Sequence, residues 1–240
     1  MNYSLILRSW RLKLLFISLL TVVPAILQAQ VRTAFPISFG IHADPMICWF
    51  GSDNSLVSNK GSRPGFSFGV TFNKYFSQNY SFSTGVDIVI AGGNLAGADT
   101  TLFKVSNGGS SSNVTVLPGE TITYRIQYLS IPLGLKLQTN QIGYLTYFTD
   151  VGLNPKIVIG GKADIPSLGI SGEKDMSEIN MFNLAYHITA GIEYGVGGNT
   201  AIIIGLSFEN NFLDVTKDIG TQPEDKITHK LLSLRLGVKF

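Results

Sequence analysis

The chain is poor in the residues that form covalent or metal crosslinks. It has one cysteine, Cys48, in 240 residues, so an intrachain disulfide is excluded and packing and hydrogen bonding must stabilise the fold. Histidine is limited to three residues, and neither paired histidines nor the spacing of a calcium-binding loop is present. We therefore expect no metal and no cofactor.

Long apolar runs are also missing after the first 30 residues. No later window offers the roughly 18 consecutive apolar residues that a membrane-spanning helix requires. The mean hydropathy is nevertheless positive, at +0.24, and only 14% of residues are charged. This combination is typical of a β-barrel, in which each lipid-facing residue alternates with a residue that faces the lumen.

The N-terminus has the features of a signal peptide. Arg8, Arg11 and Lys13 precede an apolar stretch at 14–27, and small residues place the cleavage site after Ala29. We therefore predict a signal peptide at 1–29 and a single barrel domain at 30–240. Without the three basic residues of the leader, fifteen Lys and Arg remain against sixteen Asp and Glu, so no nucleic-acid partner is expected.

Alternating apolar and polar residues predict eight strands. In the last one, Leu232, Leu234, Leu236, Val238 and Phe240 share one face. The fourth strand changes parity near Tyr128, which we interpret as a bulge at 128–129 that keeps its apolar residues on one face. The predicted strands are 35–43 with an extension to 49, 66–73, 80–90, 123–137, 144–154, 182–194, 201–209 and 231–240.

The connections alternate in length along the chain. Long ones are predicted at 50–64, 92–121, 160–179 and 210–228, the second of them irregular, and short ones join the other strands. This order is typical of an all-β, eight-stranded antiparallel up-and-down transmembrane β-barrel with long extracellular loops and short periplasmic turns. A soluble barrel of the same strand number would bury the apolar face instead, and the final Phe240 favours the membrane form.

Charged residues of the strands share the face opposite the apolar one, and Lys156 is among them. An eight-stranded barrel has an interior that side chains can fill, so these groups are predicted to form a salt-bridged lumen without a continuous pore. The predicted lumen cluster is Asp87, Arg125, Lys136, Asp150, His187, Glu193, Glu209, Arg235 and Lys239. Phe240 is the predicted barrel-assembly signal.

Three segments carry a resemblance to a known family. They are 128–136 (YLSIPLGLK), 152–156 (GLNPK) followed by 161–163 (GKA), and 190–195 (AGIEYG). They resemble strand motifs of PorT-like outer-membrane β-barrel proteins of Gram-negative bacteria, over about residues 35–240. The resemblance implies a location in the cell outer membrane, and for the family's namesake an association with a protein-secretion machine.

No catalytic signature accompanies the barrel pattern. His187 is the best candidate for a general base, but no Gly-x-Ser-x-Gly elbow is present, and we expect it to be an interior polar residue. His229 is expected to be solvated beside a loop. Asp214, Asp218, Glu224 and Asp225 could bind a cation or lipopolysaccharide, although a solvated acidic loop is the simpler interpretation.

The sequence therefore predicts a non-enzyme that is structural or binds a partner through its outer loops. Apolar contact points are expected at 102–103, 165–170 and 212–213. The expected partners are outer-membrane lipid and lipopolysaccharide, the barrel-assembly machinery, and an envelope or secretion-machine protein. Two alternatives remain open, which are a narrow channel for small solutes and a lipid-modifying outer-membrane enzyme.

Overall fold

Strands make up almost all of the structure, a computed structural model that describes residues 37–53, 56–98, 100–107, 110–174, 179–217 and 226–240. The predicted signal peptide at 1–29 lies outside these residues. The elements are β1 (Ile37–Ser52), β2 (Val57–Asn59), β3 (Arg63–Ser77), β4 (Tyr80–Gly97), β5 (Thr101–Asn107), β6 (Ser110–Val116), β7 (Ile122–Ser130), β8 (Leu133–Gln138), β9 (Leu145–Ile165), the 3-10 helix η1 (Pro166–Leu168), β10 (Ile170–Lys174), β11 (Phe182–Gly197), β12 (Thr200–Asn211) and β13 (Ile227–Lys239). No helix within these ranges is long and apolar enough to cross a membrane.

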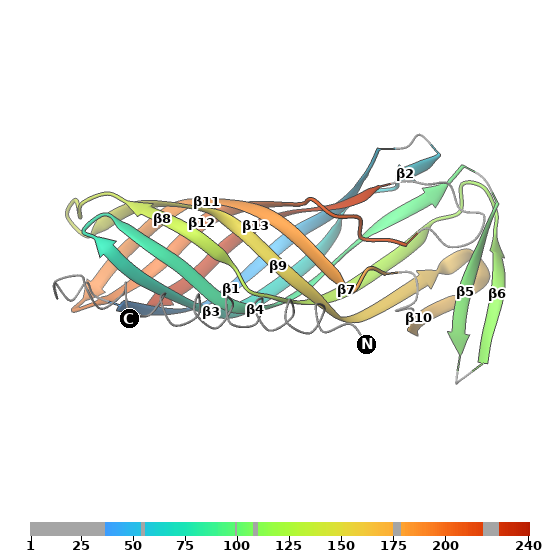
Figure 1. Ribbon diagram of the computed structural model, residues 1–240, viewed down its shortest axis with the longest axis horizontal. Helices are drawn as coiled ribbons and strands as arrows, with labels where there is room; N and C mark the ends of the chain where they lie inside the picture. The colour runs from blue at the N-terminus through green and yellow to red at the C-terminus, as the bar shows by residue number, and fades with distance from the viewer. Residues whose placement is uncertain (1–36, 54–55, 99, 108–109, 175–178, 218–225) are drawn as a thin grey trace, which may run out of the picture. The chain divides into compact units, whose positions relative to one another are not determined.

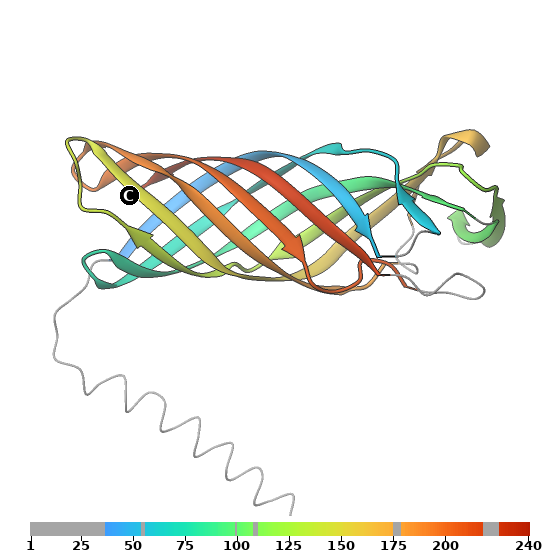
Figure 2. The same ribbon diagram turned by 90° about the horizontal axis from the view of Figure 1, so that it is seen from above.

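The strands close into a ring (Figures 1 and 2). Within the described residues the order is β1, β3, β4, β7 with β8, β9, β11, β12 and β13, and all pairs are antiparallel. β13 returns to β1, where Ile41 pairs with Val238 and Ser52 with Ile227. Phe240 continues this seam through two backbone hydrogen bonds with Phe39, of 2.7 and 3.2 Å. The predicted eight-stranded up-and-down barrel with a closing C-terminal strand is confirmed.

The two ends of the barrel differ in the length of their connections. At one end, here called the turn end, β3 joins β4, β8 joins β9 and β11 joins β12 through short turns. At the other, the loop end, the connections hold β2, the β5–β6 hairpin, η1 and β10 (Figure 1). In outer-membrane barrels the long connections face the outside.

Two predicted loops contain more regular structure than expected. β4 continues to Gly97, and the segment predicted to be irregular at 92–121 also forms the β5–β6 hairpin, a separate two-stranded sheet. β9 likewise extends to Ile165, well into the predicted loop at 160–179. Strands that extend beyond the membrane do not need an apolar residue at every second position. The alternation of apolar and polar residues therefore did not predict these strands.

The outer face of the barrel is apolar. In β1, exposed and buried residues alternate almost without interruption, and the exposed ones include Ile37, Phe39, Ile41 and Ile47. Phe39 keeps 58% of its surface exposed although it lies in the middle of a sheet. A water-soluble barrel would bury this face, so the exposed band identifies the surface as the one that contacts lipid.

The fourth strand of the ring departs from the prediction. It is divided at Ile131 and Pro132 into β7 and β8, but its parity does not change, since Tyr124, Ile126 and Tyr128 are buried inside with the later even-numbered residues. The predicted bulge at 128–129 is wrong. The irregularity lies opposite, on β9, because Gln127 pairs with Gly160 and Tyr128 with Val158.

Candidate functional site

The interior of the barrel is divided into a polar and an apolar half. Toward the turn end, buried charged and hydroxyl-bearing side chains fill the lumen. Toward the loop end, the interior is a cluster of apolar side chains from β1, β4, β7, β9 and β13 with contributions from the loops. The candidate site is the polar half, because it contains most of the predicted lumen cluster.

A small cavity lies in the polar half, with a volume of about 40 Å³. Its acidic and basic lining residues are His42, Asp44, Asp87, Asp150, His187, Glu209 and Arg235. A second space of about 20 Å³ shares His42, Asp150 and Arg235 with it and is also lined by Lys136 and Lys239. We refer to these two adjoining spaces together as the lumen chamber.

His42 and Arg235 connect three strands at the centre of the chamber through two aspartates. His42 Nε2 lies 3.2 Å from Asp87 Oδ1, and His42 Nδ1 lies 3.0 Å from Asp44 Oδ2. Arg235 Nε donates a hydrogen bond of 3.2 Å to the same oxygen of Asp44. β1, β4 and β13 are therefore linked by side chains as well as by their backbones.

Glu193 holds two lysines near the turn end. It forms ion pairs with Lys136 of β8 and Lys239 of β13, and only 2% of its side chain is exposed. The Lys136 ammonium also lies 4.5 Å from the centre of the Phe148 ring, a favourable cation–π position. This triad crosses the lumen between strands that are not neighbours.

Lys156 marks the boundary between the polar and apolar halves. It is fully buried and forms an ion pair with Glu209, which also accepts a 2.5 Å hydrogen bond from Asn154. The Lys156 ammonium lies 5.2 Å from the centre of the Tyr128 ring. A charge at this position is compensated on one side by a carboxylate and on the other by an aromatic face.

His187 pairs with Asp150 across β11 and β9. The distance from Nε2 to Asp150 Oδ1 is 3.3 Å, and the exposed fractions of the two residues are 6% and 5%. Gly134 allows this packing, because an added Cβ would lie 2.1 Å from Asp150 Oδ1. The pair has the composition of a general-base dyad but lies inside the barrel.

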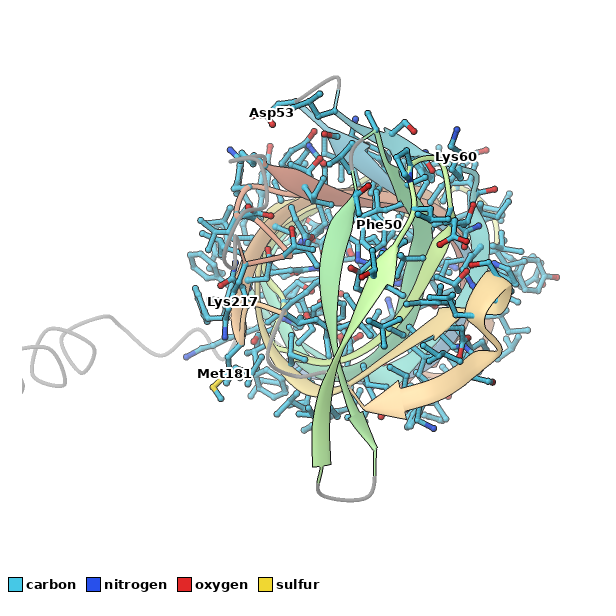
Figure 3. The ribbon with its side chains drawn as sticks, turned by 90° about the vertical axis from the view of Figure 1, so that its right-hand side faces the viewer. Phe50, Asp53, Lys60, Met181 and Lys217 are labelled. Carbon is cyan, nitrogen blue, oxygen red and sulfur yellow. The ribbon has the colours of Figure 1, made fainter. Side chains whose placement is uncertain are left out.

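The apolar half closes the lumen above the chamber. Phe50 is 1% exposed and lies within the ring of strands when the barrel is viewed from the loop end (Figure 3). Gly93 lets the Phe50 ring approach β4, since a Cβ at this position would lie 2.4 Å from the ring. Ile179 and Val215, 2% and 1% exposed, complete the cluster from the loops.

His229 belongs to this apolar half, and the prediction that it is solvated is wrong. It is completely buried, 3.3 Å from the Tyr128 hydroxyl and 3.2 Å from the carbonyl oxygen of Gly92. Its ring also packs against Phe50, with 4.7 Å between centroids. The predicted strand began at residue 231, whereas β13 begins at Ile227, which carries His229 into the barrel.

Arg125 is the member of the predicted lumen cluster that lies elsewhere. Its side chain is 52% exposed and pairs with Asp164 at 2.5 Å, and the continuous parity of β7 places it on the outer face. The other eight members, Asp87, Lys136, Asp150, His187, Glu193, Glu209, Arg235 and Lys239, are buried or half-buried in the interior.

The predicted lumen cluster did not include His42 and Asp44. Both are buried, and even-numbered residues of β1 alternate with exposed ones from Ile37 onward. His42 already lay on the polar face of the predicted strand at 35–43, and Asp44 lay in its extension to Trp49 with the same parity. The alternation therefore contained the signal that places both residues inside.

Several other predicted positions can be compared with the structure. Asp214 accepts hydrogen bonds from the backbone of Thr216 and Ile227, a loop-stabilising role, whereas Asp218, Glu224 and Asp225 lie outside the described residues. Ile165 is fully buried and offers no contact point, but Phe212 is 44% exposed. Within the described ranges, no group of three or more His, Cys, Asp or Glu side chains is arranged to hold a metal.

Comparisons with solved structures found outer-membrane barrels. Neisserial surface protein A is 15% identical, with a TM-score of 0.45 over 85% of this chain and 95% of that chain. The outer membrane protein AlkL is 13% identical, with a TM-score of 0.46 over 88% and 93%. OprG from Pseudomonas aeruginosa is 12% identical, with a TM-score of 0.41 over 88% and 99%. A search of curated proteins gave no match.

A family model describes the same class of protein. The model of the outer membrane protein beta-barrel domain matches residues 27–217, which is more than half of the chain. The match agrees with the closed ring of eight strands and with the lipid-facing apolar band. The chain therefore belongs to the outer membrane protein beta-barrel domain family, and it is located in the outer membrane.

Proposed function

We propose that the protein is a non-enzymatic barrel that is structural or binds a partner at its loop end. The observation that carries this proposal is the filled interior. Ion pairs occupy the turn half of the lumen and apolar side chains occupy the loop half. In a barrel whose lumen has no open path, specific recognition must take place at the loops or on the outer surface.

The size of the lumen chamber supports this proposal over a channel. A single water needs a cavity of roughly 10–15 Å³, so a chamber whose larger part measures about 40 Å³ holds a few waters and no hydrated solute. A solute would also have to displace Phe50, Ile179 and Val215. Passage would therefore require the cluster to unpack.

Exposed apolar side chains and a projecting hairpin at the loop end support partner binding. Leu117 is 58% exposed, Met181 66% and Phe212 44%. The β5–β6 hairpin extends from the same end as a separate sheet (Figure 1). The PorT-like motifs at 128–136 and 190–195 favour an envelope or secretion-machine protein as the partner.

Planar lipid bilayers test the filled interior. We expect the purified, folded protein to produce no stable conductance steps at neutral pH. As a positive control, the variant F50A/I179A/V215A opens the apolar half and should conduct more often than the wild type. Stable single-channel currents from the wild type would contradict the proposal and favour the channel alternative.

Crosslinking in living cells tests the partner. A photoreactive amino acid at Leu117 or Met181 should give a discrete crosslinked product, and the same residue at the lipid-facing Phe82 should not. Absence of a product at the loop positions, together with an intact envelope and intact secretion in a deletion strain, would contradict partner binding and leave the structural role.

The His187–Asp150 pair provides the test of the enzyme alternative. Both residues are more than nine-tenths buried, which supports a structural role over contact with a lipid substrate. We expect purified protein to lack lipid hydrolase and acyltransferase activity. Activity in the wild type that disappears in His187→Ala would overturn the non-enzymatic proposal.

A further inference from the structure

His42 occupies an unusual position between two carboxylates. Its Nε2 faces Asp87 Oδ1 at 3.2 Å and its Nδ1 faces Asp44 Oδ2 at 3.0 Å. The contact to Asp44 is an ion-pair approach and not a well-aligned hydrogen bond. A neutral imidazole has one N–H, so one of these two contacts would place a nitrogen lone pair against a carboxylate oxygen. With both carboxylates ionised, only the imidazolium makes both contacts attractive.

The charge balance of the polar half independently favours one added proton among its interior groups. In the described part of the chain, five interior carboxylates, of Asp44, Asp87, Asp150, Glu193 and Glu209, face four interior cations, of Lys136, Lys156, Arg235 and Lys239. One negative charge is left over. An uncompensated charge in a low-dielectric interior is costly, and one added proton removes it.

We propose that His42 is a proton-binding site, and that its imidazolium fastens β1 to β4 across the lumen. The charged and titratable groups that line the chamber around it are Asp44 on β1, Asp87 on β4, Lys136 on β8, Asp150 on β9, His187 on β11, Glu209 on β12, and Arg235 and Lys239 on β13. The lining residues on β3, which are Ser67, Thr71 and Asn73, are uncharged. This inference goes beyond the proposed function and holds whether or not a partner binds.

The location gives the proton a structural consequence. The β1–β13 pairing passes from Ala43 opposite Leu236 to Met46 opposite Ser233, and Asp44 and Pro45 have no partner in that register. Proline has no N–H to donate at this point. Asp44 bridges the same place through its side chain, held by Arg235 and His42. The Arg235–Asp44 contact therefore bridges the seam where backbone pairing is interrupted, and the His42 imidazolium compensates the charge of the same Asp44 carboxylate.

The direction of the pH effect follows from this placement. The folded barrel holds the proton between two carboxylates, whereas an unfolded chain exposes the imidazole to water. The stabilisation is therefore present at lower pH and is lost as the pH rises and the folded protein gives up the proton. We expect unfolding to become faster as the medium becomes alkaline, and His42 to be the group responsible.

Nitrogen NMR of histidine-labelled barrel in lipid measures the protonation state directly. At about pH 7, where an ordinary imidazole is mostly neutral, His42 should show the two similar nitrogen shifts of an imidazolium. His42→Gln assigns the signal by removing it. Widely separated nitrogen shifts for His42, as in a neutral tautomer, would overturn the proposal.

Heat-modifiable gel mobility measures the consequence for the barrel. The rate at which wild-type barrel converts to the unfolded band should increase severalfold when the pH is raised from about 7 to 10, because loss of the imidazolium removes its stabilisation. His42→Lys keeps a cation over most of this pH range and should reduce the increase. The matched control His187→Gln, at the other histidine that lines the lumen chamber, should retain it. Equal pH profiles in wild type and His42→Lys would overturn the proposal even if every variant folds.

Discussion

At the scale of single residues, the interior charges are held in pairs whose members come from different strands. Lys156 on β9 reaches Glu209 on β12, and Glu193 on β11 holds lysines from β8 and β13. Desolvating each charge is unfavourable, and its partner offsets this cost only while both are present. Removing one member should therefore be more harmful than removing both.

The Lys156–Glu209 pair provides a direct test. Lys156→Met leaves Glu209 without its cation, and we expect it to lower the free energy of unfolding by about 3 kcal/mol. The double variant Lys156→Met, Glu209→Gln should recover most of this loss. Urea unfolding in lipid vesicles, followed by the fluorescence of Trp49, measures both.

Arg125 is the matched control for that experiment, since its side chain is half exposed and its pair lies on the outer face. Arg125→Met should cost less than about 1 kcal/mol, because exposed ion pairs are screened by solvent. Equal losses in Arg125→Met and Lys156→Met would contradict the division between interior and surface pairs.

At the scale of elements, the β5–β6 hairpin and the ring of strands have different roles. β5 and β6 pair with each other and with no strand of the ring, whereas every ring strand pairs on both sides within the described residues. Val114 and Val116 at the end of the hairpin nevertheless pack on the apolar cluster. We therefore expect most of the hairpin to be dispensable for closure of the barrel.

Replacement of residues 101–113 by a short Gly-Ser linker tests this division. We expect the barrel to insert and to keep heat-modifiable mobility, with a change of less than about 1 kcal/mol in the free energy of unfolding, because loop-closure entropy depends weakly on length. Loop-end crosslinking should decrease if the hairpin contributes to partner binding. Loss of insertion would show instead that the hairpin is needed for folding. As a control, deletion of residues 123–127, which belong to a strand of the ring, should prevent insertion.

At the scale of the whole molecule, closure of the sheet depends on the β1–β13 seam. The seam joins residues almost 200 positions apart, from Gly40 opposite Lys239 to Ser52 opposite Ile227. A closed sheet has no free edge, and in lipid an unpaired backbone edge is too costly to persist. The register of this seam therefore determines the structure of the entire barrel.

Engineered cysteines test the register. In a Cys48→Ala background, Ile41→Cys with Val238→Cys should form a disulfide under mild oxidation, because directly opposite residues in antiparallel strands lie within disulfide distance. Ile41→Cys with Leu234→Cys places the second thiol on the same lipid-facing side but four residues away, and should not crosslink. Equal crosslinking of the two pairs, measured by gel mobility, would contradict the register.

Much of this architecture was predictable from the sequence, because contact with lipid constrains the residues of every strand. Each strand must present apolar side chains to the bilayer at every second position, so β11 and β13 carry their orientation in their own alternation. The strand number, the order of long and short connections and the interior position of Glu193, Lys136 and Arg235 all followed from that constraint.

The tertiary structure decided what alternation cannot encode. Tyr124, Ile126 and Tyr128 are apolar and were expected to face lipid, but the loop half of the lumen is itself apolar, so hydrophobicity alone did not distinguish its two faces. For the same reason Arg125 was expected inside. The contacts of His42 with Asp44 and Asp87, and of Lys156 with Glu209, depend on closure of the ring, which brings together side chains from strands far apart in the sequence.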